Sequence, residues 1–108
     1  GKVVLVRFPF SDLSATKLRP ALVLAQAGRG DVILCQITSQ PYSDRAATEL
    51  FNADFAVGTL RRQSYVRPAK LFTSNDSIID RIIGTLKDEK FEEVLGTVRS
   101  LFEPKGKR

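Results

Sequence analysis

Two arginines in the chain each precede a proline, at Arg19-Pro20 and at Arg67-Pro68. A residue before proline is kept out of the helical region and adopts an extended backbone. A guanidinium directed in this way can bind a phosphate through two parallel hydrogen bonds. Arginines of this kind also occur as ordinary residues at strand ends. The sequence therefore leaves two interpretations open for these arginines, phosphate ligands or strand-end residues.

Hydroxyl side chains follow an apolar stretch in the segment Thr38-Ser39-Gln40-Pro41, directly after residues 32–37. Hydroxyls at the end of a strand are usually turn residues, because they hydrogen-bond to the nearby backbone. They can equally donate hydrogen bonds to a phosphate oxygen where the loop borders a charged cleft. Thr38 and Ser39 are therefore candidates to act beside an arginine.

Short apolar runs rich in β-branched residues predict the strands that position these side chains. We expect strands over 3–8, 21–25, 32–37, 48–51, 64–67 and 69–72, with Pro68 at an edge or a bend between the last two. Residues 10–18 are small and polar, which favours a loop. Residues 78–86 fit either one helical face or a helical turn followed by a strand.

The last segment has apolar residues at helical spacing from Phe91 to Phe102, with acidic residues near its start. This pattern predicts an amphipathic helix that packs on the sheet and ends near Pro104. Many short strands followed by one helix favour a mainly β fold, a small barrel or strongly bent antiparallel sheet. We expect a single domain over 1–103 and a basic tail over 104–108.

Arg19 and Thr38 occupy related positions in the predicted hairpin formed by 21–25 and 32–37. Arg19 begins the first strand, residues 26–30 form the turn, and Thr38 ends the second strand. In an antiparallel hairpin, these two ends lie at the same edge of the sheet. Arg19 and Thr38 can therefore face one phosphate.

The charges are unevenly placed along a chain whose formal net charge is +5. Residues 55–75 contain no acid but four basic residues, and the first thirty residues contain five basic residues and one acid. Acids gather instead at the start of the predicted helix. This placement favours a polyanionic partner over a merely solvated basic face.

Several kinds of chemistry are excluded by composition. The chain has no histidine, so it can form neither a serine-histidine-aspartate triad nor a histidine metal site, and one cysteine cannot build a zinc knuckle. It contains neither a P-loop nor a GxGxxG motif. Cys35 lies in an apolar run and is interpreted as a core residue. With no bilayer-length apolar run and no signal-peptide pattern, we expect a cytoplasmic protein without a membrane partner.

Taken together, these segments resemble the PemK/MazF family of toxins from bacterial toxin-antitoxin modules. The most specific pair is RPALVL at 19–24 after a turn-rich loop, with ITS at 37–39 ending the matching strand. The resemblance extends over nearly the whole chain, through KVVLV at 2–6, FP at 8–9, SYVR at 64–67, KLFT at 70–73, IGTL at 83–86 and a terminal helix.

The resemblance implies an SH3-like barrel that forms a homodimer and cleaves single-stranded RNA with no metal or other cofactor. In the family, the 2′-hydroxyl attacks the adjacent phosphorus and leaves a cyclic phosphate and a free 5′-hydroxyl. Arg19 and Thr38 match the central catalytic residues. Lys17, Ser39, Arg67 and Lys70 are the expected RNA-binding residues. The implied protein partner is an antitoxin whose disordered acidic tail occupies the RNA groove.

The chain departs from the family pattern after SYVR at 64–67. Some members carry an acidic or amide residue shortly after this segment, with a proposed role in proton transfer, whereas here the stretch reads Pro68-Ala69-Lys70. The general base is therefore unassigned among Asp12, Asp44 and Glu49. Two alternatives to a ribonuclease stay open: a non-catalytic SH3-like module that binds nucleic acid or an acidic peptide, and an interaction protein that uses its strand edges to dimerise.

Overall fold

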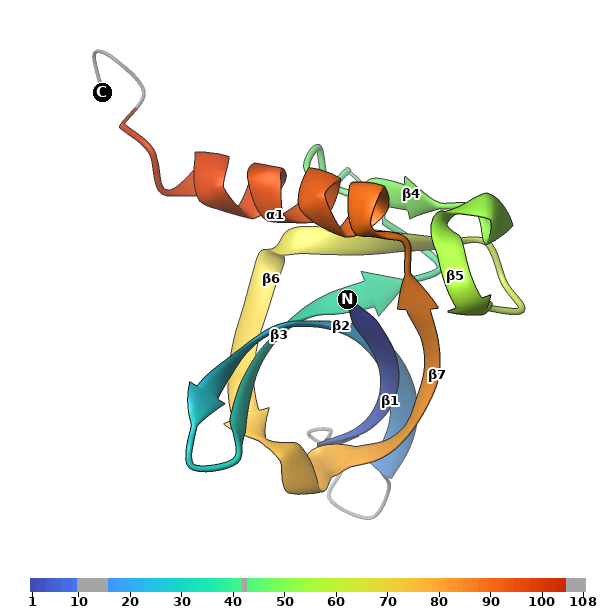
Figure 1. The fold of residues 1–108 in the computed structure, drawn as a ribbon, viewed down its shortest axis with the longest axis vertical. Coiled ribbons are helices and arrows are strands. Elements are labelled where there is room, and N and C mark those ends of the chain that lie inside the picture. Colours follow the sequence, from blue (N-terminus) through green and yellow to red (C-terminus); the bar gives the residue numbers. More distant parts are fainter. Residues whose placement is uncertain (10–15, 42, 105–108) are drawn as a thin grey trace.

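The computed structural model describes residues 1–9, 16–41 and 43–104. These residues form one antiparallel seven-stranded sheet in the order β4-β6-β3-β2-β1-β7-β5, followed by a C-terminal helix. The sheet curls strongly on itself, and the helix lies across one end of β6 (Figure 1). The elements are β1 (Lys2–Pro9), β2 (Thr16–Gly28), β3 (Asp31–Thr38), β4 (Thr48–Leu50), β5 (Phe55–Gly58), β6 (Ser64–Asn75), β7 (Ile79–Leu86) and α1 (Asp88–Leu101). The predicted mainly β barrel with a terminal helix is confirmed.

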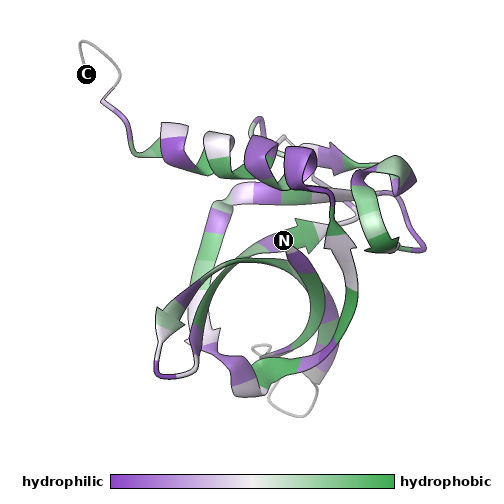
Figure 2. Ribbon diagram, in the orientation of Figure 1, coloured by the Kyte–Doolittle hydropathy of each residue, from purple (hydrophilic) through white to green (hydrophobic). Residues whose placement is uncertain are grey.

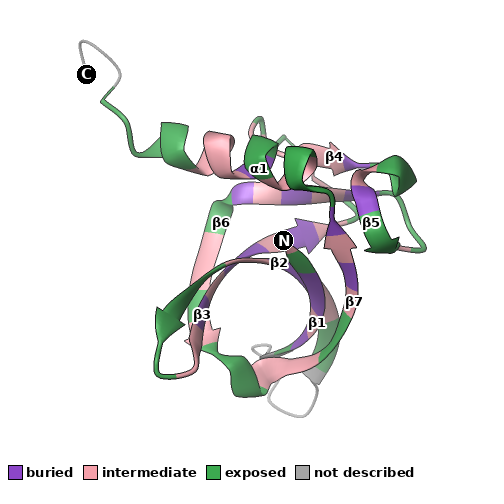
Figure 3. Cartoon of the chain, in the orientation of Figure 1, coloured by how far each residue is buried: buried purple, intermediate pink, exposed green. Residues whose placement is uncertain are grey.

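Alternation along the strands places apolar side chains on both faces of the sheet. On β1, Val3 belongs to the cluster that Val94 of α1 helps to form, whereas Val4 and Val6 belong to a second cluster with residues of β2 and β3. Figure 2 shows the hydrophobic stretches on these strands, and Figure 3 shows the buried residues of β6 beneath the helix. A sheet that is packed on both faces gives the residues at its edges a rigid support.

Strand β6 is one continuous strand, where the sequence predicted two strands separated by Pro68. Its pairing with β3 shifts between Cys35↔Leu71 and Gln36↔Arg67, so residues 68–70 have no counterpart on β3. Pro68 is fully buried within this irregularity, beyond the β4 ladder, so its missing N–H interrupts neither ladder. The strand bends sharply on its way from β4 to its far end (Figure 1). The bend was predicted correctly, and the break was not.

Residues 79–86 form a strand, which decides between the two alternatives that the sequence left open. A short 3-10 turn at Asp76–Ile78 precedes β7, and β7 pairs with both β1 and β5. Gly84 allows β5 to approach, because a Cβ at this position would lie 2.9 Å from the Val57 carbonyl oxygen. Strand β5 was not predicted from the sequence.

Helix α1 confirms the predicted amphipathic segment. Asp88 and Glu89 occupy its first turn, where the helix dipole favours negative charge, and Val94 is fully buried against the sheet. The basic residues 105–108 of the expected tail lie outside the described residues. Within the described part of the chain, no helix is long and apolar enough to cross a membrane.

Candidate active site

Arg19 lies inside strand β2 and not at its start, because β1 pairs with β2 from Thr16 onwards and sets Arg19 opposite Val6. Apolar periodicity cannot detect this polar first part of the strand. The ladder between β2 and β3 ends at Ala21↔Gln36, so Arg19 and Thr38 each lie two residues beyond its last pair. They therefore lie at the same edge of the sheet, just past the end of this ladder, and both line one hollow.

A surface hollow of about 480 Å³ lies at this edge. Arg19 lines it from β2 and Thr38 from the end of β3, and the Nε atom of Arg19 is buried. Lys17 and Ser39, two of the predicted RNA-binding residues, line it as well. The hollow therefore holds both predicted catalytic residues and half of the predicted binding residues.

The segment between β5 and β6 forms another wall of the hollow, through Leu60, Arg61, Arg62 and the first residue of β6, Ser64. This segment is not among the site residues predicted from the sequence, although the acid-free stretch that contains Arg61 and Arg62 was the signal that could have indicated it. Both arginines are exposed. Among the described residues, those that line the hollow include four cations and no carboxylate, which suits a polyanionic ligand.

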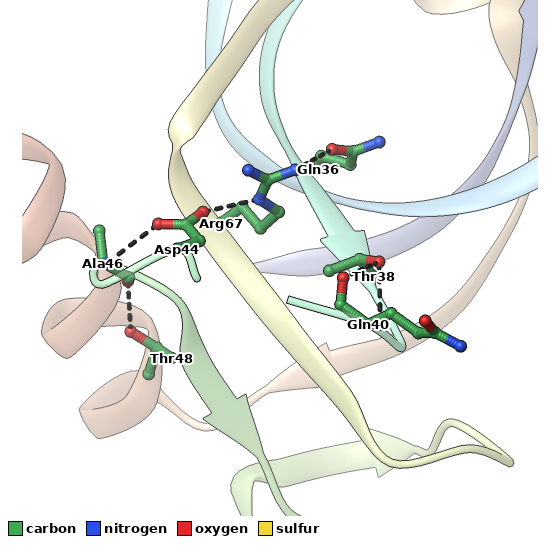
Figure 4. Close-up of polar contacts among 7 residues, drawn as sticks. All are labelled: Gln36, Thr38, Gln40, Asp44, Ala46, Thr48 and Arg67. Atoms are coloured by element: carbon green, nitrogen blue, oxygen red, sulfur yellow. Dashed lines mark hydrogen bonds and ion pairs between the residues drawn. The ribbon is translucent and has the colours of Figure 1, made fainter. Parts of the chain in front are cut away.

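The Thr38 hydroxyl is held by its own loop. Its Oγ1 accepts a hydrogen bond from the Gln40 amide at 3.1 Å and lies 3.3 Å from the Gln40 carbonyl oxygen, to which it donates (Figure 4). This is the local turn that a threonine forms at the end of a strand. The turn interpretation and the ligand interpretation of Thr38 are thus compatible, because the turn fixes a hydroxyl that borders the hollow.

Arg67 and Lys70 are not among the residues that line this hollow. The Arg67 guanidinium binds the Asp44 carboxylate, with Nε 2.6 Å from Oδ2, and its Nη1 donates to Gln36 Oε1 at 3.3 Å (Figure 4). Lys70 is exposed and lines a smaller hollow of about 230 Å³ together with Gln36. The structure therefore separates these two predicted RNA-binding residues from Arg19 and Thr38.

The three candidate general bases have different surroundings. Asp12 lies outside the described residues. The Arg67 guanidinium holds the pKa of the Asp44 carboxyl below its usual range. Glu49 accepts a hydrogen bond from Gln63 and lines a neighbouring hollow of about 260 Å³, which shares Arg61 and Arg62 with the first. No described carboxylate therefore lies in the hollow of Arg19 and Thr38.

Cys35 is fully buried in the core, as predicted, and burial raises the pKa of its thiol to about 12. A protonated, enclosed thiol is neither a nucleophile nor a metal ligand. The described residues hold no group of three or more Asp, Glu or Cys side chains that could bind a metal ion. The chemistry that the site permits is phosphate binding by guanidinium, ammonium and hydroxyl groups.

Comparison with protein families gives a match over residues 1–102, almost the whole chain. The matching family is described as the PemK-like, MazF-like toxin of type II toxin-antitoxin systems. None of the curated proteins is similar enough in sequence to match.

Solved structures share the fold at low sequence identity. The Mycobacterium tuberculosis toxin MazF-mt6 superimposes with a TM-score of 0.72 at 19% identity, over 94% of this chain and 96% of that chain. A MazE–MazF structure from Deinococcus radiodurans gives a TM-score of 0.75 at 21% identity, over 94% of this chain and 91% of that one. An endoribonuclease in complex with its cognate antitoxin, from a mycobacterial species, gives 0.67 at 16% identity, over 96% of each chain.

Proposed function

Because the chain belongs to the PemK-like, MazF-like toxin family of type II toxin-antitoxin systems, we propose that it is an endoribonuclease that cleaves single-stranded RNA without a metal ion. The observation that carries this proposal is the cationic hollow that both Arg19 and Thr38 line, just past the end of the β2–β3 ladder. A toxin whose site binds phosphate and faces solvent is suited to act on a polynucleotide.

The reaction needs a stabilised phosphorane and two proton transfers. The 2′-hydroxyl oxygen forms a bond to the adjacent phosphorus, the bond from phosphorus to the 5′-oxygen breaks, and the products are a cyclic phosphate and a 5′-hydroxyl. The 2′-hydroxyl loses its proton and the leaving oxygen gains one. Arg19 stabilises the negative charge that develops on the phosphorane, because a guanidinium is a permanently charged, strong hydrogen-bond donor and a poor acid. Thr38 turns its one hydroxyl hydrogen from the Gln40 carbonyl to a non-bridging oxygen, while its Oγ1 still accepts from the Gln40 amide.

Flanking phosphates are bound by the other cations of the hollow. Lys17 and Arg61 are exposed and line it, as does Arg62, so these side chains can follow the RNA backbone on either side of the scissile phosphate. Ser39 adds a hydroxyl beside Thr38. Lys70 is an outer contact, because it is exposed but lines a separate hollow.

The partners follow from the same surface. The Deinococcus radiodurans structure is of MazE and MazF, and the mycobacterial endoribonuclease is in complex with its cognate antitoxin. We propose that this chain likewise binds an antitoxin, which inhibits it, and that it forms a homodimer in the cytoplasm. An acidic segment of that antitoxin fits the hollow because the charged residues among its described lining, Lys17, Arg19, Arg61 and Arg62, are all cations.

One observation favours a second function. The described residues that line the hollow include no carboxylate to take the proton of the 2′-hydroxyl, so a module that holds RNA without cutting it is the alternative. Such a module would show salt-dependent RNA affinity without turnover.

The two functions are separated by incubating the purified protein with end-labelled single-stranded RNA in EDTA. The ribonuclease predicts fragments ending in a cyclic phosphate, and their loss in Arg19→Ala and Thr38→Ala. Binding by the wild type with no fragments would establish the alternative. Equal cleavage by Arg19→Ala would refute the assignment of the site.

A further inference from the structure

The Arg67 side chain joins strand β3, just before Thr38, to the loop that follows Thr38. One of its nitrogens contacts Gln36, two residues before Thr38 on β3, and another contacts Asp44, six residues after it. We propose that Arg67 is a positioning residue: it ties the β3–β4 loop to β6 and thereby holds the Thr38 hydroxyl at the hollow. This inference rests on the proposed function of Thr38.

Asp44 transmits this restraint to the rest of the loop through its own hydrogen bonds. Its amide donates to the Pro41 carbonyl at 3.1 Å. Its Oδ1 accepts from the Ala46 amide at 3.0 Å, as Figure 4 shows. The Ala47 amide donates to the Asp44 carbonyl at 3.2 Å. The Asp44 residue therefore organises both halves of the described loop, and its carboxylate is the point at which Arg67 anchors them.

The ion pair between Arg67 and Asp44 lies in a partly buried position, which strengthens it. The side chains of Arg67 and Asp44 are 22% and 10% exposed, so water screens their attraction less than at an open surface. A short charge-assisted hydrogen bond also has narrow geometry, which makes it a better positional restraint than a packed apolar contact. Removing either partner leaves the other charge partly buried and uncompensated.

The bend of β6 explains how this arginine reaches the loop. Arg67 is opposite Gln36 at the last ladder position before the irregularity at 68–70, and Pro68 restricts its backbone to an extended conformation. The Arg67-Pro68 pair thus serves a different purpose from the Arg19-Pro20 pair. The former directs a guanidinium to a carboxylate within the protein, and the latter directs one to the hollow.

The alternative role, a phosphate ligand, requires Arg67 to leave Asp44. The guanidinium already binds a carboxylate and an amide oxygen, and it does not line the hollow of Arg19. A phosphate ligand and a positioning residue predict different measurements, so one set of variants separates them.

The test compares two variants, Arg67→Ala and Arg67→Lys, with the matched control Arg45→Ala. Arg45 is an exposed arginine next to Asp44 in the sequence. Three quantities are measured: the single-turnover cleavage rate at saturating RNA, the salt dependence of RNA affinity, and hydrogen exchange of the Gln40 amide, which donates to Thr38. We expect Arg67→Ala to lower the rate roughly 10- to 100-fold, since small misplacements of catalytic groups have effects of this size. Gln40 exchange should rise at least about tenfold while the salt slope stays unchanged.

Arg67→Lys should recover part of the rate, because an ammonium can still bind Asp44 but cannot also reach Gln36. Arg45→Ala should change none of the three quantities. If Arg67→Ala does not fold, as judged by circular dichroism, Asp44→Asn removes the same ion pair with little change of volume and carries the same expectations.

A fall of about 0.7 in the salt slope with unchanged Gln40 exchange would overturn the proposal and make Arg67 a phosphate ligand. Unchanged Gln40 exchange in folded Arg67→Ala would overturn it whatever happens to the rate. If the wild type cleaves no RNA, the proposed function fails, and the exchange measurement still decides whether Arg67 restrains the loop.

Discussion

Arg19 and Thr38 line one hollow although the ladder that joins their strands ends earlier, at Ala21 and Gln36. Beyond that ladder the two strand ends are supported from other sides. The β1 ladder continues past Arg19 to Thr16, and the β6 ladder continues to Thr38, which lies opposite Tyr65. The hollow opens where β2 and β3 separate, and two elements outside this hairpin fix its two central side chains.

Arg19→Ala should abolish most of the cleavage activity. A preorganised donor to a developing oxyanion contributes about 2.7–4 kcal/mol to transition-state stabilisation, which corresponds to a loss of about 100- to 1000-fold in rate. Arg19→Lys should recover little of it, because an ammonium lacks the planar fork that binds two oxygens. Single-turnover cleavage of a labelled RNA measures both variants. A lysine variant with nearly wild-type rate would show that only positive charge is needed.

Arg61→Gln and Arg62→Gln should weaken RNA binding without affecting chemistry at saturating RNA. Each residue is exposed at the wall of the hollow, so its contribution is electrostatic. Each phosphate contact that is lost should reduce the slope of log affinity against log salt by about 0.7 for single-stranded nucleic acid. Titration of a labelled RNA at several salt concentrations measures this slope.

Arg29→Gln is the matched control for these two variants. Arg29 is exposed at the turn between β2 and β3, at the opposite end of β2 from Lys17. An equal change of slope in Arg29→Gln would mean that RNA binds diffusely over the basic surface and not in the hollow.

Much of the site could be predicted because it depends on pairing between neighbouring strands. The apolar runs identified β2 and β3, and antiparallel geometry then placed Arg19 near Thr38. The wall that carries Arg61 and Arg62 could not be found in this way. It is contributed by a segment distant in sequence, and periodicity says nothing about where a polar loop folds back.

The role of the second arginine-proline pair also could not be predicted from the sequence. The sequence gives Arg19 and Arg67 similar local restraints, and only the tertiary fold places Asp44 beside one of them. Strand β5 was missed because its sequence does not alternate between apolar and polar residues. Its apolar residues Ala56 and Val57 are exposed to solvent. The sequence of its partner β7 fitted both a helix and a strand. The local pattern could not show that Gly84 is needed for the close approach of a neighbouring strand.

Gly58→Ala should destabilise the fold by about 1–3 kcal/mol. Gly58 has a φ of +72°, and a Cβ there would lie 2.2 Å from the Ile83 carbonyl oxygen, so β5 would have to move away from β7. Gly96→Ala is the control, because nothing lies within 4 Å of the added Cβ on α1. This control should stabilise the protein by about 0.5–1 kcal/mol through helix propensity. Urea unfolding followed by circular dichroism compares the two, and equal stabilities would contradict the close packing of β5 on β7.

The ion pair of Asp44 should make stability depend on pH in the acid range. The Arg67 hydrogen bond lowers the pKa of the Asp44 carboxyl in the folded protein, and Lys70 contributes in the same direction. The stabilisation is therefore fully present above the ordinary carboxyl pKa of about 3.9, and it is lost as the pH falls through the lowered folded value. Asp44→Asn should accordingly be less stable than the wild type at neutral pH, and the difference should shrink below pH 4. Melting temperatures measured from pH 7 down to pH 2 test this, and a difference that does not change with pH would mean that the ion pair contributes nothing.

Glu49→Gln should change which RNA sites are cut and leave the rate at the best site within a few-fold of wild type. The Glu49 carboxylate lies beside Gln63 in the hollow next to that of Arg19 and Thr38, and the two hollows share Arg61 and Arg62. An RNA strand bound along both would therefore place a neighbouring nucleotide against Glu49. A carboxylate there accepts hydrogen bonds from exocyclic amino groups of bases, whereas an amide can also donate.

Sequencing the fragment ends from a long mixed-sequence RNA measures this change. Glu92→Gln is the matched control, because Glu92 is an exposed carboxylate on α1 that lines neither hollow. A uniform loss of cleavage at every site in Glu49→Gln, together with loss of the acid limb of the pH–rate profile, would instead make Glu49 the group that accepts the proton of the 2′-hydroxyl. Either result decides between a base-reading and a proton-accepting Glu49, because the first changes the pattern of cut sites and the second changes the rate at all of them.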